Sequence, residues 1–367
     1  MEKVMSRKLI TISTIMTLMS TSVMADVPNV AADIAPIHSL VSKVMDGVGE
    51  PKLVIQSGAS PHGYRLRPSE AKALQDANLI FWMGEELTPW LEGAIDTLAS
   101  NASVTALLDQ EGIVLHDFRQ GALFEAHDHD DHDDHDDHDD HDDHKDHDDH
   151  KDHDDHDGHD DHKDHDDHKD HDDHDGHDDH KDHDGHDDHK DHDDHGHGAH
   201  DPHAWLSPEN AKLWLNIIAS KLSVADPENA ASYFTNAAVG QVEIEDMVAE
   251  VSATLKPVQG GKFVVFHDAY QYFENDFDFY ASGAISLSDA SDPSPARIAR
   301  IQKRIRDEGI QCVLAEPQFK QGLVATVMEG SEATASVIDP LGADIKPGPM
   351  LYTQLIKNMA KKIKDCL

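Results

Sequence analysis

The sequence predicts an α/β fold of two lobes, each built on a mostly parallel sheet flanked by helices, with a long rigid helix joining them. Short apolar runs rich in β-branched residues alternate with longer amphipathic runs in both halves of the chain. Such strand–helix–strand alternation implies parallel strands that are covered by helices. The alternation is broken once, by a stretch of helical pattern without strands, and there one lobe should pass into the other.

The predicted strands are short apolar runs bounded by polar or turn-forming residues. They are residues 52–57, 79–84 and 103–108 in the first half, and 262–267, 312–317 and 336–342 in the second. The helices between them place apolar residues three and four positions apart. They are residues 68–77, 88–99, 294–309 and 352–367.

The central part of the chain, residues 208–255, has helical pattern only. Its longer helix should begin after Pro227 and end before Pro257, because proline is tolerated at a helix start but not in a helix interior. At 1.5 Å per residue such a helix is about 40 Å long. We expect it to act as a strut between the lobes that permits only small relative movement.

Residues 127–200 consist almost entirely of histidine and aspartate. This tract contains 26 of the 31 His, with 36 Asp and 6 Lys, so it carries −30 of the formal net charge of −43. It has almost nothing apolar to bury and its charges repel one another, so nothing offsets the chain entropy that folding would remove. We therefore predict a disordered loop inserted into the first lobe.

The remaining 293 residues carry a formal charge of −13 and are only moderately acidic. They contain no basic stripe that could neutralise the phosphates of a nucleic acid. Nucleic acid is therefore not an expected partner.

The first 25 residues have the three parts of a secretory signal peptide. Lys3, Arg7 and Lys8 form a basic start, residues 9–19 are an apolar core too short to span a membrane, and cleavage is expected near Ala25. No cysteine follows the apolar core, so a lipid attached to a processed N-terminal cysteine is not expected. We predict export to the periplasm.

The chain has two cysteines, Cys312 and Cys366. In an oxidising compartment a pair of this kind favours a disulfide. The bridge would close a loop of about 55 residues, which corresponds to about 4 kcal/mol in the chain-entropy description. The sequence has no Cys-x-x-Cys motif, so a structural bridge is favoured over a redox or metal-ligand role.

Three of the five histidines outside the tract occupy similar positions. His62 follows a predicted strand, His267 ends one, His203 precedes a helix, and Asp339 ends another strand. In open α/β folds ligands bind at the rim formed by the carboxyl ends of strands. Three imidazoles and one carboxylate suit Zn(II) better than harder cations, which require more oxygen ligands. Each histidine alone is also consistent with a structural or surface position.

Five short strings extend this interpretation by their order along the chain. They resemble the ZnuA-type zinc-binding proteins of ABC transporters, within the metal-binding cluster A-I of solute-binding proteins. The strings are GASPHGYRLRPS (58–69), DPHAWLSPENA (201–211), VVFHDAYQYFE (264–274), AEPQF (315–319) and IDPLG (338–342). The resemblance covers essentially the whole chain. It implies a two-lobed binding protein rather than an enzyme, with an interlobe zinc site whose ligands are His62, His203 and His267.

The resemblance leaves the fourth ligand open. Some members have a glutamate directly before the first ligand histidine, where this chain has Pro61, so Asp339 or a water remains for that place. Manganese-binding relatives have a carboxylate where His267 stands, and the imidazole here favours zinc over manganese. Glu316 is a candidate partner of a ligand. The Cys312–Cys366 pair matches a bridge found in some zinc-binding members.

The tract suggests a second role in metal handling. Histidines spaced mostly three apart form many weak, flexible chelates, and the surrounding carboxylates raise the local cation concentration. We expect a collector or sensor of zinc; the alternative is a solubilising spacer. The histidines named for this role are His127, His129, His132, His135, His138, His141, His144, His195, His197 and His200.

The expected function is delivery of Zn(II) to a membrane ABC permease by a monomeric periplasmic protein, with a periplasmic zinc chaperone as a further candidate partner. The alternatives are uptake of manganese or another divalent metal, and a zinc buffer. A secreted zinc hydrolase is disfavoured because the sequence has no HExxH or comparable motif.

The expected organisation follows from these segments. It is a signal peptide (1–25), the N-terminal lobe (26–126 and 201–226) with the inserted tract (127–200), the linking helix (227–256) and the C-terminal lobe (257–367).

Overall fold

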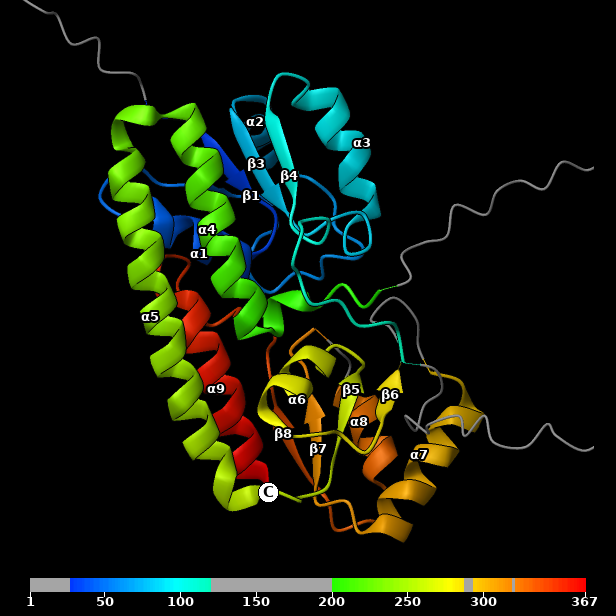
Figure 1. Cartoon of the computed structure of the whole chain (residues 1–367). Helices are drawn as coiled ribbons and strands as arrows, with labels where there is room; N and C mark the ends of the chain where they lie inside the picture. The colour runs from blue at the N-terminus through cyan, green and yellow to red at the C-terminus, as the bar shows by residue number, and fades with distance from the viewer. Residues whose placement is uncertain (1–26, 120–199, 287–292, 319–320) are drawn as a thin grey trace, which may run out of the picture. The chain divides into compact units, whose positions relative to one another are not determined.

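The computed structural model describes residues 27–119, 200–286, 293–318 and 321–367. The predicted signal peptide and the predicted tract, apart from His200, lie outside these described residues. The described residues form two similar α/β halves with long helices beside them (Figure 1). No helix among them is long and apolar enough to cross a membrane.

Each half contains a four-stranded parallel sheet with the same pattern of strand order. The first sheet has the order β2-β1-β3-β4 and the second β6-β5-β7-β8, and all pairs are parallel. The first four strands are β1 (Val30–Ala32), β2 (Lys52–Leu53), β3 (Leu79–Trp82) and β4 (Ser103–Ala106). The others are β5 (Phe263–His267), β6 (Ala284–Ser286), β7 (Cys312–Ala315) and β8 (Thr334–Val337). The predicted pair of parallel-sheet lobes is therefore confirmed.

The helices begin and end where local signals indicate. Ser207 and Ser294 accept hydrogen bonds from backbone N–H groups in the first turns of α4 and α7, and Gly309 ends α7 in the left-handed conformation. The helices are α1 (Ala35–Val44), α2 (Pro68–Gln75), α3 (Pro89–Leu98), α4 (Pro208–Ala225), α5 (Ala230–Leu255), α6 (Gln271–Phe277), α7 (Pro295–Glu308), α8 (Gln321–Met328) and α9 (Leu351–Cys366). Short 3-10 turns η1 (Ala204–Leu206), η2 (Pro227–Asn229) and η3 (Lys256–Val258) precede α4 and flank α5.

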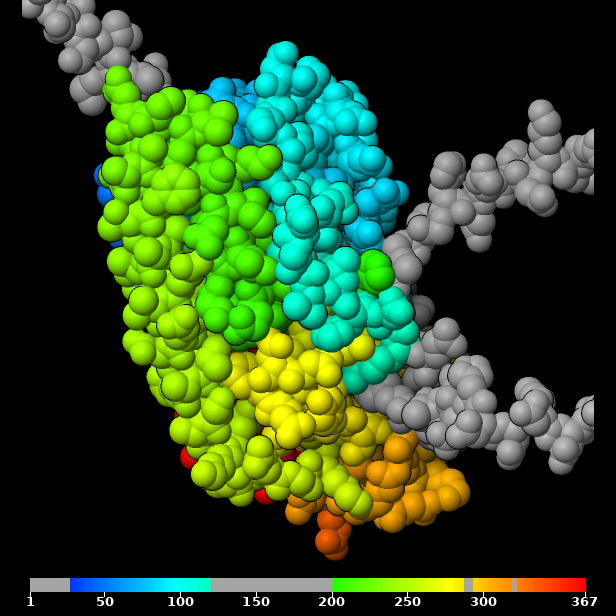
Figure 2. Space-filling view, viewed as in Figure 1, coloured from blue at the N-terminus to red at the C-terminus, as the bar shows by residue number. Residues whose placement is uncertain are grey.

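Helix α5 is the long helix expected after Pro227. It packs against α1 and α4 of the first half and against α9 of the second (Figure 1). Its buried residues recur at helical spacing: Tyr233, Ala237, Gly240, Ile244, Met247, Val251 and Leu255. At Gly240 a Cβ atom would lie 2.9 Å from Leu215 Cδ1, so glycine permits the close approach of α4. Its opposite face is exposed in the space-filling view (Figure 2).

The two halves are also joined by hydrogen bonds between buried groups. The backbone N–H of Tyr352 on α9 donates to Ser39 Oγ on α1 (3.0 Å), and the hydroxyl of Tyr352 donates to the carbonyl of Ser207 (3.2 Å). The indole Nε1–H of Trp205 donates to the carbonyl of Pro340 (2.8 Å). These contacts lie beside the loops that carry the predicted ligands His203 and Asp339.

The predicted disulfide is present. Cys312 on β7 and Cys366 at the end of α9 are bonded, with Cα atoms 5.6 Å apart, and the two residues are 54 positions apart in sequence. The bond attaches the last turn of α9 to the centre of the second sheet, because β7 lies between β5 and β8.

We predict that the double variant Cys312→Ala/Cys366→Ala lowers the free energy of unfolding by about 4 kcal/mol, because the unfolded chain regains the entropy of a long loop. Urea titration of metal-free protein measures the change. Wild-type protein under a reducing agent should match the variant. Equal midpoints for oxidised wild type and the variant would contradict a stabilising role.

Candidate metal centre

The four predicted ligands lie at loops that follow strands or precede a helical turn. His267 is the last residue of β5, His203 directly precedes η1, His62 lies in the turns after β2, and Asp339 follows β8. Strand β8 ends at Val337, so Asp339 lies beyond the strand and not within it. The placement at the carboxyl ends of parallel strands agrees with the expectation for ligand sites in such sheets.

Two of the imidazoles face each other. The Nε2 atoms of His203 and His267 are 3.4 Å apart, and the centroids of the two rings are 5.2 Å apart. Both residues are buried, at 5% and 3% exposure. The ring of His62 is half-buried, and its centroid lies 5.6 Å from that of His203. The structure therefore brings together histidines from three distant segments of the chain.

A buried carboxylate holds the other nitrogen of each facing ring. The Nδ1–H of His203 donates to Asp201 Oδ1 (2.6 Å), and the Nδ1–H of His267 donates to Glu316 Oε1 (2.5 Å). Glu316 is fixed in turn by the side-chain amide of Gln318, which donates to its Oε2 (2.7 Å). A ring that donates from Nδ1 keeps a lone pair on Nε2, so both lone pairs point into the space between the rings.

This arrangement suits a cation between the rings. Two lone pairs at 3.4 Å repel unless a positive charge lies between them. In a tetrahedral Zn(II) site with Zn–N bonds of 2.0–2.1 Å, two ligand nitrogens are about 3.3–3.4 Å apart. The Nε2–Nε2 distance of His203 and His267 matches one edge of that tetrahedron. Histidine ligands of zinc generally donate their second N–H to a carboxylate or a carbonyl, as both do here.

His62 and Asp339, the other two predicted ligands, are not grouped with His203 and His267 closely enough to share one ion. Within residues 27–119, 200–286, 293–318 and 321–367, no three His, Cys, Asp or Glu side chains are already grouped closely enough to hold an ion. Asp339 directs its carboxylate at its own loop: Oδ1 accepts from the backbone N–H of Leu341 (2.9 Å) and Gly342 (3.0 Å), and Oδ2 from Ala343 (2.5 Å). A carboxylate oxygen has two lone pairs, so these bonds fix Asp339 without using all its acceptor capacity.

Besides the two carboxylates, buried aromatic rings lie near the facing imidazoles. The ring of Trp205 lies 5.1 Å from that of His203 and is buried, and the ring of Tyr270 lies 6.3 Å from that of His267. Burial, with the charge of Glu316 as the next contribution, raises the pKa of Tyr270 well above its ordinary value, so its hydroxyl stays neutral. Electrostatic interactions are stronger in such water-poor surroundings.

Sequence reasoning identified Glu316 as a candidate partner of a ligand but missed Asp201. The string DPH places a carboxylate two residues before His203, and the structure uses this spacing to contact both the backbone N–H and Nδ1 of His203. A search for a carboxylate near each candidate histidine could have found Asp201. The partner of His267 comes from a different strand, 49 positions away.

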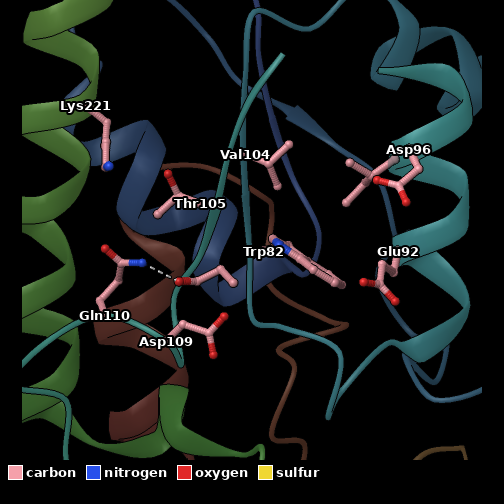
Figure 3. A pocket seen from close by; sticks show the side chains of 10 residues that line it. Trp82, Glu92, Asp96, Val104, Thr105, Asp109, Gln110 and Lys221 are labelled. Carbon is pink, nitrogen blue, oxygen red and sulfur yellow. Dashed lines mark hydrogen bonds between the residues drawn. The ribbon is translucent and has the colours of Figure 1, made fainter. Parts of the chain in front are cut away.

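A separate cavity in the first half has different chemistry. It has a volume of about 380 Å³ and lies beside β4, between the side chains of α3 and α4 (Figure 3). Glu92, Asp96, Asp109 and Lys221 contribute its charges, and none of the predicted ligands lines it. The predicted metal chemistry therefore belongs to the histidine loops and not to this cavity.

Two parallel-sheet lobes and a long helix packed against both are a fold that this chain shares with solved structures of similar architecture. A solved structure titled crystal structure of ZnuA aligns with a TM-score of 0.64 at 19% identity, covering 93% of this chain and 99% of that one. A periplasmic metal-binding protein from Candidatus Liberibacter asiaticus aligns with a TM-score of 0.62 at 16% identity, covering 92% and 99%. At these identities the similarity concerns the fold.

The chain belongs to the family described as zinc-uptake complex component A, periplasmic, whose family model matches residues 30–366. It is 46% identical over 338 residues to the high-affinity zinc uptake system protein ZnuA of Brucella abortus, covering 92% of this chain and 91% of the relative. It is 43% identical over 344 residues to the protein of the same name from Paracoccus denitrificans, covering 94% and 93%. The resemblance inferred from the five strings is confirmed.

We predict that metal-free protein at pH 8 has His203 and His267 in the Nδ1–H tautomer, because each Nδ1 faces a buried carboxylate. Two-bond proton–nitrogen correlation spectra distinguish the tautomers. In Glu316→Gln the preference at His267 should weaken while that at His203 persists. An Nε2–H tautomer at both rings of the wild type would contradict the orientation of the lone pairs.

Proposed function

We propose that this protein binds Zn(II) between its lobes in the periplasm and delivers it to a membrane ABC permease for high-affinity uptake. The observation that supports this best is the pair of facing Nε2 atoms at 3.4 Å, each on a ring held by a buried carboxylate. The similarity to relatives named high-affinity zinc uptake system protein ZnuA supports zinc as the transported ion. The family description supports a role within an uptake complex.

In this proposal His62, His203 and His267 are three ligands, and Asp339 or a water is the fourth. His203 and His267 are already at the spacing of a zinc edge, so binding requires chiefly that His62 approach them. Asp339 would have to offer a remaining lone pair while its loop retains the three backbone bonds. The nitrogen-rich donor set favours zinc over manganese, which prefers more oxygen ligands.

Two alternative functions, uptake of another divalent metal and zinc buffering, predict different experimental results. A manganese or other divalent-metal uptake protein would bind that ion at least as tightly as zinc in a direct competition. A zinc buffer would protect cells against excess zinc but would not support growth in chelated medium. Deletion of the gene, followed by growth in both media, separates uptake from buffering. A hydrolase would show turnover that depends on His267, which we do not expect.

We further propose that residues 127–200 collect zinc or sense its abundance before it reaches the lobes. Support comes from composition alone: 26 histidines lie among 36 aspartates. Flexible chelates of this kind lose chain entropy when they bind, so their affinity should be weaker than that of the preoriented site. A periplasmic zinc chaperone is a candidate source of the metal.

We also propose the organisation expected from the sequence. Residues 1–25 would be a signal peptide removed near Ala25, and the mature protein would act as a monomer. The N-terminal lobe would comprise 26–126 and 201–226, the linking helix 227–256 and the C-terminal lobe 257–367. Mass spectrometry of the exported protein tests the cleavage position, and light scattering tests the monomer.

We predict that His267→Ala weakens zinc binding at least about 100-fold, because loss of a ligand exceeds the 10–100-fold effect typical of losing a ligand's partner. Competition with a fluorescent chelator, on protein lacking residues 127–200, measures the affinity of the interlobe site alone. His38→Gln is the matched control, because His38 is also buried but contacts the carbonyl of Pro51 (3.1 Å). Equal affinities for wild type and His267→Ala would contradict the proposed site.

We predict that deletion of residues 127–200 lowers the number of zinc ions bound per chain at high zinc but leaves one tight site. Isothermal titration of the two proteins measures stoichiometry and affinity together. A variant with every tract histidine replaced by asparagine controls for length and negative charge. If this variant binds as many ions as wild type, the carboxylates alone carry the capacity and the histidine depot is refuted.

A further inference from the structure

Arg119 makes a charged contact between the lobes beside the candidate metal centre. Its Nε donates to Oδ1 (3.0 Å) and Oδ2 (3.1 Å) of Asp268, and its Nη1 donates to Glu274 Oε2 (2.6 Å). The arginine side chain is 15% exposed, and the two carboxylates are 6% and 1% exposed. Charge-assisted bonds of this kind, made in a forked geometry, are among the stronger polar contacts in proteins.

The three residues come from elements that also hold the imidazoles. Asp268 directly follows His267, and Glu274 lies on α6. Arg119 lies five positions after Val114, whose backbone accepts and donates hydrogen bonds with the side chain of Asn210 on α4. The space-filling view shows this end of the first described stretch lying against the segment around α6 (Figure 2).

A second hydrogen-bonded path runs beside the arginine. The hydroxyl of Tyr272 on α6 accepts from the backbone N–H of His116 (3.1 Å) and donates to the carbonyl of Asp201 (2.8 Å). Asp201 in turn holds Nδ1 of His203. The segment 116–119 is therefore linked to Asp201, which holds the ring of His203, through Tyr272. It also contacts Asp268, which directly follows His267.

The charged groups of this cluster would act on a nearby cation as well as on the contact between the lobes. Burial raises the pKa of Asp268 and of Glu274, and the guanidinium of Arg119 acts in the opposite direction on both. By Coulomb's law alone, a cation close to a zinc site weakens zinc binding, so removal of Arg119 would slow zinc release. A mechanical role makes the opposite prediction, because loss of the contact between lobes would speed release.

We propose that Arg119 is a positioning residue that clamps the two lobes together and slows the release of zinc. The proposal rests on the proposed function, since it assumes that His203 and His267 bind the metal. The clamp acts through Asp268, which carries the backbone next to His267, and through Glu274, which fixes α6. Release to a permease would then require that this contact open.

The test is the rate of zinc dissociation from full-length Arg119→Gln, measured by stopped-flow with an excess of a chromogenic chelator. The clamp predicts that dissociation from the tight site becomes at least about tenfold faster with little change in the association rate, because loss of one partner of a buried charge pair acts mainly on dissociation. The dissociation rate of Arg119→Lys should lie between those of the wild type and Arg119→Gln, because one ammonium group cannot bridge both carboxylates in the same forked geometry.

Lys43→Gln is the matched control. Lys43 is 12% exposed and pairs with Glu243 at 2.7 Å between α1 and α5, so its loss removes a comparable ion pair that does not involve α6. Its zinc dissociation rate should equal that of the wild type. An unchanged or slower rate in Arg119→Gln would overturn the clamp.

Loss of the arginine alone leaves two buried carboxylates together, and this can unfold the protein. The variant Arg119→Met/Asp268→Asn/Glu274→Gln removes all three charges, one positive and two negative, so that no buried charge is left unpaired, and the clamp predicts fast dissociation here too. A wild-type rate in this folded triple variant would overturn the proposal. If instead His267→Ala binds zinc as tightly as wild type, the proposed site itself fails, so the two failures are distinguishable.

Discussion

The orientation of two imidazoles by two buried carboxylates is the constraint on which the rest of the structure depends. A histidine can present a lone pair to a metal only if its other nitrogen carries the proton, and Asp201 and Glu316 enforce that state. Each carboxylate is buried, and a buried polar group that loses its hydrogen-bond partner destabilises the fold. The carboxylates and the rings therefore stabilise one another, and the two imidazoles are held in one orientation.

The fold supplies this geometry by placing strand ends and helix starts at one boundary. His267 and Glu316 come from the adjacent strands β5 and β7, whose carboxyl ends lie side by side. His203 comes from the other half, where the turn before η1 and α4 is fixed by Ser207 and by the bond from Trp205 to Pro340. Helices α5 and α9 hold the halves together, and the disulfide attaches α9 to β7.

Much of this could be predicted from the sequence, because the signals are local. Alternating apolar runs indicated the two sheets, the prolines bounding α5 indicated its extent, and the strings around His62, His203 and His267 indicated the family. Strands β1 and β6 were missed because each has only three residues, too few for a pattern to stand out. The predicted strand at 52–57 is only two residues long in the structure.

The contacts that depend on tertiary packing could not be predicted in the same way. The bonds of Arg119 span about 150 positions in sequence, and nothing near Arg119 distinguishes it from an exposed arginine. Asp339 was placed correctly near a strand end, but its carboxylate is taken by backbone groups of its own loop. The conformation of the loop decides which lone pairs of Asp339 remain available to a metal. Residue type alone does not specify this conformation.

The packing of α5 has a thermodynamic consequence. This helix contacts α1 and α4 on one side of the boundary and α9 on the other, so if it limits movement of the halves as expected, capture of an ion would expose or bury little apolar surface. The heat capacity change that accompanies metal capture should then be small, unlike that of binding proteins whose domains close widely around a ligand. The heat of binding would come mainly from metal–nitrogen bonds and displaced water, and it would vary little with temperature.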